Sequence, residues 1–200
     1  MKINIVHYKD ARAMNEVEAN SIRLIITSPP YWNIKDYARD GKQERIYSEK
    51  ATGQIGDIAD YKDYIESMTA VWKECERILK PNGKLCVNAP LMPILKSKLH
   101  THYNRDIVNI NSGIEHNILT KTKLFLHDVY IWNRTNPSKK LMFGSYPYPP
   151  NFYAQNTVEF ITVFVKDGKP EYIPKEVREK SKLAEQEWVT FTKQVWNIPI

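Results

Sequence analysis

Near its start the chain carries a nearly all-apolar run, Ile22–Thr27, which Ser28-Pro29-Pro30-Tyr31 follows without a spacer. A strand without alternating polar residues is typical of a parallel sheet, in which both faces are buried. Proline has no N–H group to donate and holds φ at about −65°, so the two prolines end the strand and stiffen the next few residues. The junction therefore predicts a rigid loop carrying Ser28 and Tyr31 at the end of a buried strand.

The periodicity of the rest of the chain predicts an α/β fold. Apolar residues recur at spacings of three and four over residues 61–79, which predicts a helix that Pro81-Asn82-Gly83 ends. Further strands are predicted over residues 3–7, 84–88, 124–132 and 158–165, further helices over 107–119 and 174–187, and a weak helix or turn over 10–17. A helix, a Pro-x-Gly stop and a buried strand form half of a βαβ crossover, which supports the α/β assignment.

The composition fits a single basic domain. A chain of 200 residues with a net charge of +6 and a pI of about 9.1 is compatible with a polyanionic partner, although a merely basic protein would share these values. Cys75 and Cys86 lie in a predicted helix and strand, which indicates core residues of a reducing compartment rather than a disulfide. No metal-ligand spacing, signal peptide or membrane-length apolar run is present, so we expect a cytoplasmic protein without a metal.

Five segments along the chain match, in order, the blocks of one enzyme family. They are TSPPYWNIKDY (residues 27–37), GQIG with the adjoining helix and strand (53–88), VYIWNRTNPSKK (129–140), NTVEFITVFVKDG (156–168) and VWNIP (195–199). The chain thereby resembles the amino-methyltransferases of restriction–modification systems, which methylate N4 of cytosine or N6 of adenine in DNA. The resemblance implies a Rossmann-like S-adenosylmethionine-dependent methyltransferase fold, circularly permuted, with the catalytic block first and the glycine loop of the cofactor site last.

The resemblance makes Ser28, Pro29, Pro30 and Tyr31 the catalytic residues. An exocyclic base amine is a poor nucleophile because its lone pair is delocalised into the ring. The Ser28 hydroxyl and the Pro29 carbonyl can accept its two hydrogens, localise the lone pair and stabilise the charge that develops. Tyr31 offers a face on which a flipped base can stack. The alternative is that Ser-Pro-Pro is an ordinary extended loop.

The resemblance also implies contacts to the cofactor and to the target base. Asp10 and Thr27 are expected beside S-adenosylmethionine, and Trp32 and Trp132 beside the target base. For Trp132 a core tryptophan at a strand end is the alternative. Serine before Pro-Pro favours N4 of cytosine, with N6 of adenine as the alternative.

Double-stranded DNA is the expected partner. Arg134, Lys139 and Lys140 are predicted to contact phosphates, which would set the register on DNA but not sequence preference; an ordinary solvated surface is the alternative. Loops 38–59 and 133–155 and segment 168–193 are candidate DNA-contact or target-recognition insertions in one partial catalytic domain spanning residues 1–200.

One family feature is missing from the sequence. The family holds its cofactor with an Asp-Pro-Phe-x-Gly-x-Gly loop, and none of the seven glycines forms a Gly-x-Gly pair. By the resemblance, the predicted strands correspond to strands 3 to 7 of the family's seven-stranded sheet, which is ordered 3-2-1-4-5-7-6, and strands 1 and 2 are absent. The strand over residues 22–27 would then present an unpaired apolar edge, and the strand over 3–7 would have no partner.

We therefore predict the amino-terminal part of a longer methyltransferase, or one half of a split enzyme whose cofactor loop lies on a missing segment or a second chain. Two alternatives remain. One is a catalytically inactive DNA-binding module that kept the fold, and the other is a basic globular protein whose Ser-Pro-Pro-Tyr is incidental.

Overall fold

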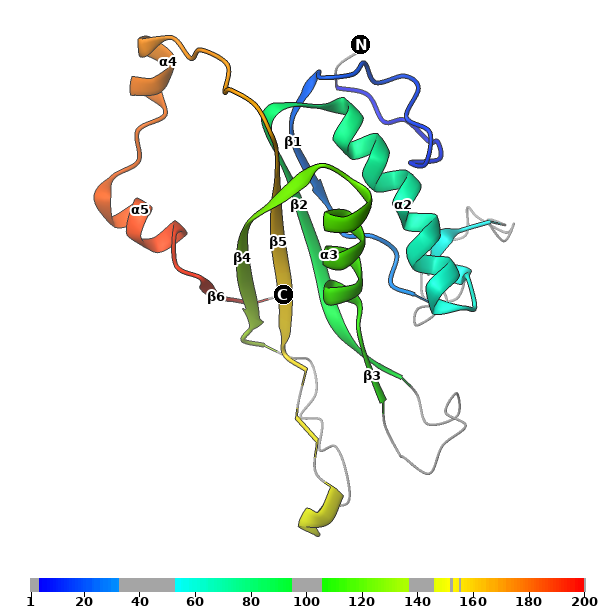
Figure 1. Cartoon of the computed structure of the whole chain (residues 1–200). Helices are drawn as coiled ribbons and strands as arrows, with labels where there is room; N and C mark the ends of the chain where they lie inside the picture. Colours follow the sequence, from blue (N-terminus) through cyan, green and yellow to red (C-terminus); the bar gives the residue numbers. More distant parts are fainter. Residues whose placement is uncertain are drawn as a thin grey trace.

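The computed structural model describes residues 4–32, 53–94, 106–136, 146–151, 153–154 and 156–199 (Figure 1). Its strands are β1 (Ile22–Thr27), β2 (Leu79–Ile94), β3 (Asp106–Asn109), β4 (Leu124–Arg134), β5 (Val158–Lys166) and β6 (Val195–Ile198). Its α-helices are α2 (Tyr61–Ile78), α3 (Ile110–Lys121), α4 (Lys175–Lys180) and α5 (Glu185–Phe191), and the short 3-10 helices η1 (Ile55–Asp57) and η3 (Pro149–Asn151) lie in loops.

The strands form a mixed sheet in the order β1-β2-β5-β4-β6, and β3 pairs with the far end of β2. β1 and β2 are parallel, β5 is antiparallel to both of its neighbours, and β6 is parallel to β4. In the numbering of the family's sheet, strands β1, β2, β5 and β4 occupy positions 4, 5, 7 and 6, which is the order that the resemblance implies for them. The carboxyl ends of β1, β2 and β4 consequently lie at one edge of the sheet.

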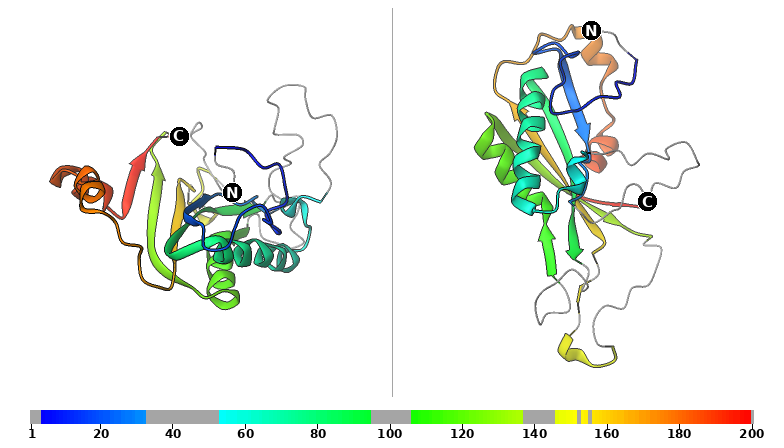
Figure 2. Two further views of the ribbon diagram at one scale, coloured as in Figure 1. Left: turned by 90° about the horizontal axis from the view of Figure 1, so that it is seen from above. Right: turned by 90° about the vertical axis from the view of Figure 1, so that its right-hand side faces the viewer.

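Helices α2 and α3 cover one face of the sheet (Figure 2). α2 begins where Asp60 caps it, because the Asp60 Oδ1 atom accepts from the backbone N–H groups of Lys62 and Asp63 at 2.8 and 3.1 Å. The side chain of Trp72 on α2 is fully buried against the sheet, and the side chain of Phe164 on β5 is fully buried in the same core. Each such large apolar side chain contributes about 1.5–3 kcal/mol when it is fully buried.

The other face of β1 is exposed, contrary to the prediction of a strand buried on both faces. Ile25 lies beside the buried Leu85 of β2, so its neighbours Leu24 and Ile26 point away from the two helices. Their exposed fractions are 53% and 75%. A parallel strand is buried on both faces only where both faces carry covering elements. Among the described residues β1 pairs with β2 alone, so it forms the unpaired edge that the sequence predicts.

The prediction of a strand over residues 3–7 is wrong for residues 4–7, the part of the range that the structure describes. Residues 4–7 are irregular, Asn4 has a φ of 59°, and Ile5 and Val6 are exposed by 48% and 73%. An extended segment becomes a strand only beside a hydrogen-bonding neighbour, and none of the described residues supplies one. The segment over 10–17 forms turns, closed by bonds from Ala13 N to Asp10 O and from Val17 N to Met14 O.

Two other boundaries differ from the prediction. β2 begins at Leu79 and runs through Pro81-Asn82-Gly83, where the sequence predicts a break between helix and strand. In the pairing with β1, an advance of two residues from Ile22 to Leu24 is matched by an advance of five residues along β2, from Leu79 to Lys84. Asn82 takes a φ of 61° in this bulge. Strand β3 precedes α3, which begins later than predicted because the Asn109 side chain caps it by accepting from Ser112 N at 3.0 Å.

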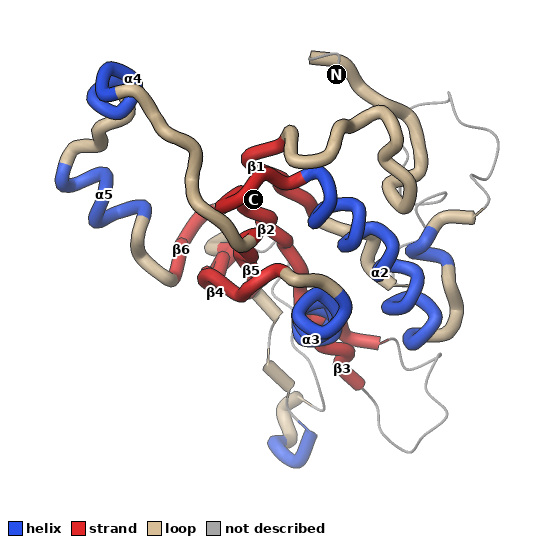
Figure 3. Tube along the Cα trace, turned by 45° about the horizontal axis from the view of Figure 1, so that its top comes forward, coloured by secondary structure: helices blue, strands red, loops and turns tan. Residues whose placement is uncertain are grey.

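The segment over 168–193 forms an arm. Its helices α4 and α5 contain no buried residue, and they lie apart from α2, α3 and the sheet (Figures 1 and 3). Exposed apolar side chains on it include Trp188 and Phe191, at 62% and 55%. None of the described helices is both long and apolar enough to cross a bilayer.

Candidate active site

The predicted catalytic loop begins where β1 ends. Thr27 closes the strand beside Val87 of β2, and the chain then turns so that two loop side chains meet. The Ser28 Oγ and Tyr31 Oη atoms lie 2.9 Å apart, a hydrogen bond in which either hydroxyl can donate. Pro29 between them is buried, whereas Ser28 is exposed. The loop therefore presents one hydroxyl pair above a fixed prolyl backbone.

The first turn of α2 supports this loop. The Tyr64 hydroxyl, on a fully buried side chain, donates to the carbonyl of Pro30 at 2.8 Å. No described residue donates to the carbonyl of Pro29. The carbonyl of Pro30 thus accepts a hydrogen bond from α2, whereas the carbonyl of Pro29 has no partner among the described residues.

Trp32 lies beside the same helix turn. Its ring meets the ring of Tyr61 edge-on, with centroids 5.2 Å apart, and Tyr61 stacks on Tyr64 at 6.1 Å. Burial raises the pKa of Tyr61, so its hydroxyl is neutral throughout the physiological range. The predicted residues Ser28, Pro29, Pro30, Tyr31 and Trp32 therefore form one cluster with two tyrosines of α2.

The sequence pattern does not single out Tyr61 and Tyr64 as site residues. Both fall on the apolar face of the predicted helix, where an aromatic residue indicates core. The available signal is their position in the first turn of the helix that comes after the loop.

Trp132 and Arg134 lie at the same edge of the sheet but three strands away, at a lateral separation of roughly 14 Å from strand spacing alone. Trp132 Nε1 donates to the carbonyl of Ile198 at 2.9 Å, which ties β4 to β6. Arg134 donates from Nε to Thr157 O at 3.2 Å, and its Nη1 lies 3.4 Å from a Glu159 oxygen. The structure does not bring either residue to Ser28, and Lys139 and Lys140 lie outside the described residues.

Asp10 is also separated from the loop. Its carboxylate accepts from the backbone N of Arg12 at 2.9 Å and from the Arg12 Nη2 at 2.6 Å, and these bonds lower the pKa of Asp10. The next segment is held at the far end of α2, because Met14 N donates to Glu74 Oε2 at 2.8 Å. Tyr64 and Glu74 are ten residues apart, which is roughly 15 Å along a helix.

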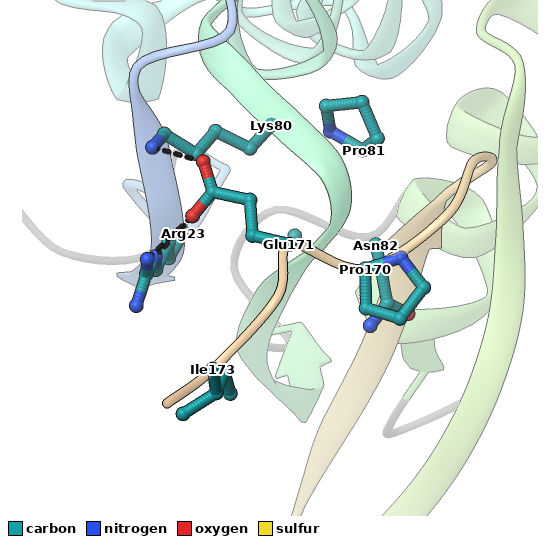
Figure 4. A pocket seen from close by; sticks show the side chains of 8 residues that line it. Arg23, Lys80, Pro81, Asn82, Pro170, Glu171 and Ile173 are labelled. Carbon is teal, nitrogen blue, oxygen red and sulfur yellow. Dashed lines mark hydrogen bonds and ion pairs between the residues drawn. The ribbon is translucent and has the colours of Figure 1, made fainter. Parts of the chain in front are cut away.

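A small hollow lies near the opposite end of β1 (Figure 4). Its volume is about 110 Å³, and its lining includes Arg23, Lys80 and Glu171. Glu171 accepts from Lys80 Nζ at 2.5 Å and from Arg23 Nε at 3.0 Å, so the carboxylate bridges β1 and β2 and fixes the base of the arm. Arg23 is five residues before Ser28, roughly 16 Å along a strand, so the hollow is not part of the loop cluster. No group of potential metal ligands gathers in the described ranges.

The model of a known protein family matches most of the chain. The family model described as DNA methylase, for N6 and N4 methyltransferases, matches residues 22–200. The type II methyltransferase M.MjaI of Methanocaldococcus jannaschii is 28% identical over 96% of this chain and 65% of its own length. M.MthZI of Methanothermobacter thermautotrophicus is 24% identical over 86% of this chain and 47% of its own. The chain thus spans less than two thirds of the length of these two relatives.

Solved structures show the same fold. The putative DNA modification methylase TTHA0409 of Thermus thermophilus, in complex with S-adenosyl-L-methionine, has a TM-score of 0.71 at 23% identity over 95% of this chain and 65% of its own. The cytosine-N4-specific PvuII DNA methyltransferase has a TM-score of 0.55 at 16% identity over 96% of this chain and 55% of its own. These likenesses confirm the predicted fold class, the α/β fold of S-adenosylmethionine-dependent methyltransferases.

Proposed function

Because the chain belongs to the DNA methylase family of N6 and N4 methyltransferases, we propose that it is the catalytic part of a site-specific DNA methyltransferase acting on an exocyclic base amine. The observation that carries the proposal is the pair of acceptors at the end of β1. Ser28 is exposed and hydrogen-bonded to Tyr31, and the carbonyl of Pro29 has no partner among the described residues. An amine with two hydrogens needs two such acceptors.

The loop activates the amine without forming a covalent bond to the base. If Ser28 donates its proton to Tyr31, its oxygen keeps lone pairs to accept one amine hydrogen, and the Pro29 carbonyl accepts the other. These two bonds draw the lone pair of the nitrogen out of the ring and stabilise the positive charge that grows on it. The base must leave the duplex to reach the loop, and Tyr31 and Trp32 are the candidates for stacking on it. When bound, S-adenosylmethionine supplies the methyl group.

We infer that the described residues form only part of a site for S-adenosylmethionine. The hollow of about 110 Å³ lies near the wrong end of β1, whereas cofactor sites commonly measure about 300–1,000 Å³. The Asp10 carboxylate is already bound by Arg12, and Gly-x-Gly is absent from the sequence. We infer that a further segment or a second chain holds most of the cofactor and covers β1, where Leu24 and Ile26 are exposed.

Serine before Pro-Pro favours N4 of cytosine as the target, with N6 of adenine as the second candidate. Loops 38–59 and 133–155 and the arm over 168–193 are the proposed DNA-contact segments. The arm carries six basic and five acidic residues, so shape and aromatic contacts would contribute more to its binding than charge. A protein with DNA as substrate and S-adenosylmethionine as cofactor is expected in the cytoplasm.

The test is transfer of a labelled methyl group from S-adenosylmethionine to DNA, by this chain alone and with the segment or chain that completes it. We expect transfer only with the completing part, and mass spectrometry of the digested DNA will show N4-methylcytosine or N6-methyladenine. Ser28→Ala should abolish transfer while leaving DNA binding intact. DNA binding without transfer by the completed protein would favour the inactive binding module instead, and unchanged transfer by Ser28→Ala would refute the assigned chemistry.

A further inference from the structure

The bond between Tyr64 and Pro30 joins two rigid parts of the molecule. Tyr64 lies in the first turn of α2, where its backbone N donates to Asp60 O at 3.0 Å and its ring stacks on that of Tyr61. The Asp60 side chain caps the same turn. A fully buried ring on a capped helix turn has little freedom to move, so its hydroxyl is held at a fixed point beneath the loop.

This fixed hydroxyl restrains the Pro29 carbonyl through Pro30. The proline ring locks φ of Pro30, so the peptide plane that contains the Pro29 carbonyl cannot rotate independently of the Pro30 carbonyl carbon. The bond of 2.8 Å from Tyr64 restrains the Pro30 carbonyl and, through the locked φ, the Pro29 carbonyl as well. Without the bond, Pro30 would lose this attachment to α2, and the Pro29–Pro30 peptide plane could shift together with the Pro30 ring to which the locked φ ties it.

We propose that Tyr64 is a positioning residue whose hydroxyl occupies the Pro30 carbonyl and thereby aims the Pro29 carbonyl at the target amine. The inference rests on the proposed function, because the aim matters only if the loop activates an amine. Tyr64 touches neither substrate nor cofactor in this role and acts through the loop backbone. Its effect is preorganisation of an acceptor, which is needed in the transition state more than in substrate binding.

The test is Tyr64→Phe in the completed, DNA-methylating protein. This change removes one oxygen and leaves the buried ring in place. We expect kcat to fall roughly 10- to 100-fold while KM for DNA stays within about two-fold, because the variant loses the alignment of an acceptor that acts mainly in the transition state. The matched control is Tyr130→Phe, a partly buried tyrosine of β4 whose ring packs on Trp196, and its kcat should not change.

Two outcomes would overturn the inference. One is a kcat of Tyr64→Phe within two-fold of the wild type. The other is a loss of rate that disappears when activity is divided by the folded fraction, since that would make the role merely structural.

A second measurement separates this inference from the proposed function. In the chain labelled with ¹³C at its proline carbonyls, the Pro30 resonance should shift in Tyr64→Phe and not in Tyr130→Phe. A completed wild-type protein that transfers no methyl group would contradict the proposed function. The Pro30 shift would then still support the bond on which the inference depends, and its absence would refute it.

Discussion

A β-carbon placed on Gly113 of α3 would stand 2.1 Å from the phenolic oxygen of Tyr61 on α2. Glycine within a helix usually costs about 1 kcal/mol relative to alanine. Here the close approach reverses the sign, because the Tyr61 ring is held between Trp32 and Tyr64 and cannot move without disturbing both. We predict that Gly113→Ala lowers the free energy of unfolding by roughly 1–2 kcal/mol, measured by urea denaturation.

The double variant identifies the cause of this loss. With Tyr61→Phe the hydroxyl is gone, and the nearest remaining atoms, Ile65 Cδ1 and the Tyr61 ring carbon, lie 3.2 Å from the added carbon. The cost of Gly113→Ala in that background should fall by about 1 kcal/mol or more. A stabilised Gly113→Ala single variant would show that the ring yields freely.

We predict that acid weakens the attachment of the N-terminal segment to α2 at Glu74. Hydrogen bonds from Arg77 lower the pKa of Glu74 below its ordinary value near 4.5, and the same carboxylate accepts from Met14 N. A lowered folded-state pKa contributes stability above the unfolded pKa, and this stability is lost as the pH falls through the folded pKa. Glu74→Gln should therefore cost about 0.5–1 kcal/mol at neutral pH, and this difference should shrink progressively below about pH 4.5.

Glu66→Gln on the same helix is the matched control. Glu66 is exposed, and its oxygen lies 3.5 Å from Lys121 Nζ, so its loss should change the unfolding free energy little at any pH. A constant difference between wild type and Glu74→Gln from neutral pH down to pH 3 would contradict the assignment.

The sequence predicted those elements that carry their own periodic signal. Helix α2 shows its apolar face every three or four residues, and β1, β4, β5 and residues 84–88 of β2 carry the apolar or β-branched residues typical of strands, so their order along the chain indicated an α/β fold. Residues 3–7 carry a similar strand signal, but a strand also needs a neighbour, and local pattern does not tell whether one is present.

The candidate site was predictable only in its loop. Ser28 to Tyr31 form a compact motif, whereas the bond from Tyr64 to Pro30 spans 34 residues and depends on how α2 crosses the end of β1. Likewise, the sequence indicates that the side chain of Arg134 contacts a DNA phosphate. Its partners Thr157 and Glu159 become evident only from the pairing of β4 with β5.

We predict that ion pairs of Glu171 hold the beginning of the arm against β1 and β2. Its carboxylate bridges Arg23 and Lys80, and the bonds from these two cations lower the pKa of Glu171. Glu171→Ala should therefore speed tryptic cleavage within residues 168–193, and high salt should do the same to the wild type. Glu176→Ala removes an exposed pair with Lys180 inside α4 and is the control, which should be cleaved at the wild-type rate. Equal cleavage of both variants would show that Glu171 does not fix the arm.

The alkylation rates of the two cysteines show whether another segment or chain covers the exposed face of the sheet. Burial raises the pKa of Cys75, inside the core, to about 12, so its thiol should resist alkylation until the protein unfolds. Cys86 is only partly buried and lies beside Ile26 of β1, on the face that the helices leave exposed. We predict faster labelling by iodoacetamide at Cys86 than at Cys75 in the chain alone, read by mass spectrometry of peptides.

Addition of the completing segment or chain should slow the labelling of Cys86 at least several-fold, because the proposed partner packs over β1 and this face. Labelling of Cys75 should stay equally slow with and without that partner, which makes it the internal control. The variant Ile26→Lys places a charge in the proposed contact and should restore rapid labelling of Cys86 in the mixture. Unchanged labelling of Cys86 in a mixture that methylates DNA would mean that the completing part binds elsewhere on the chain.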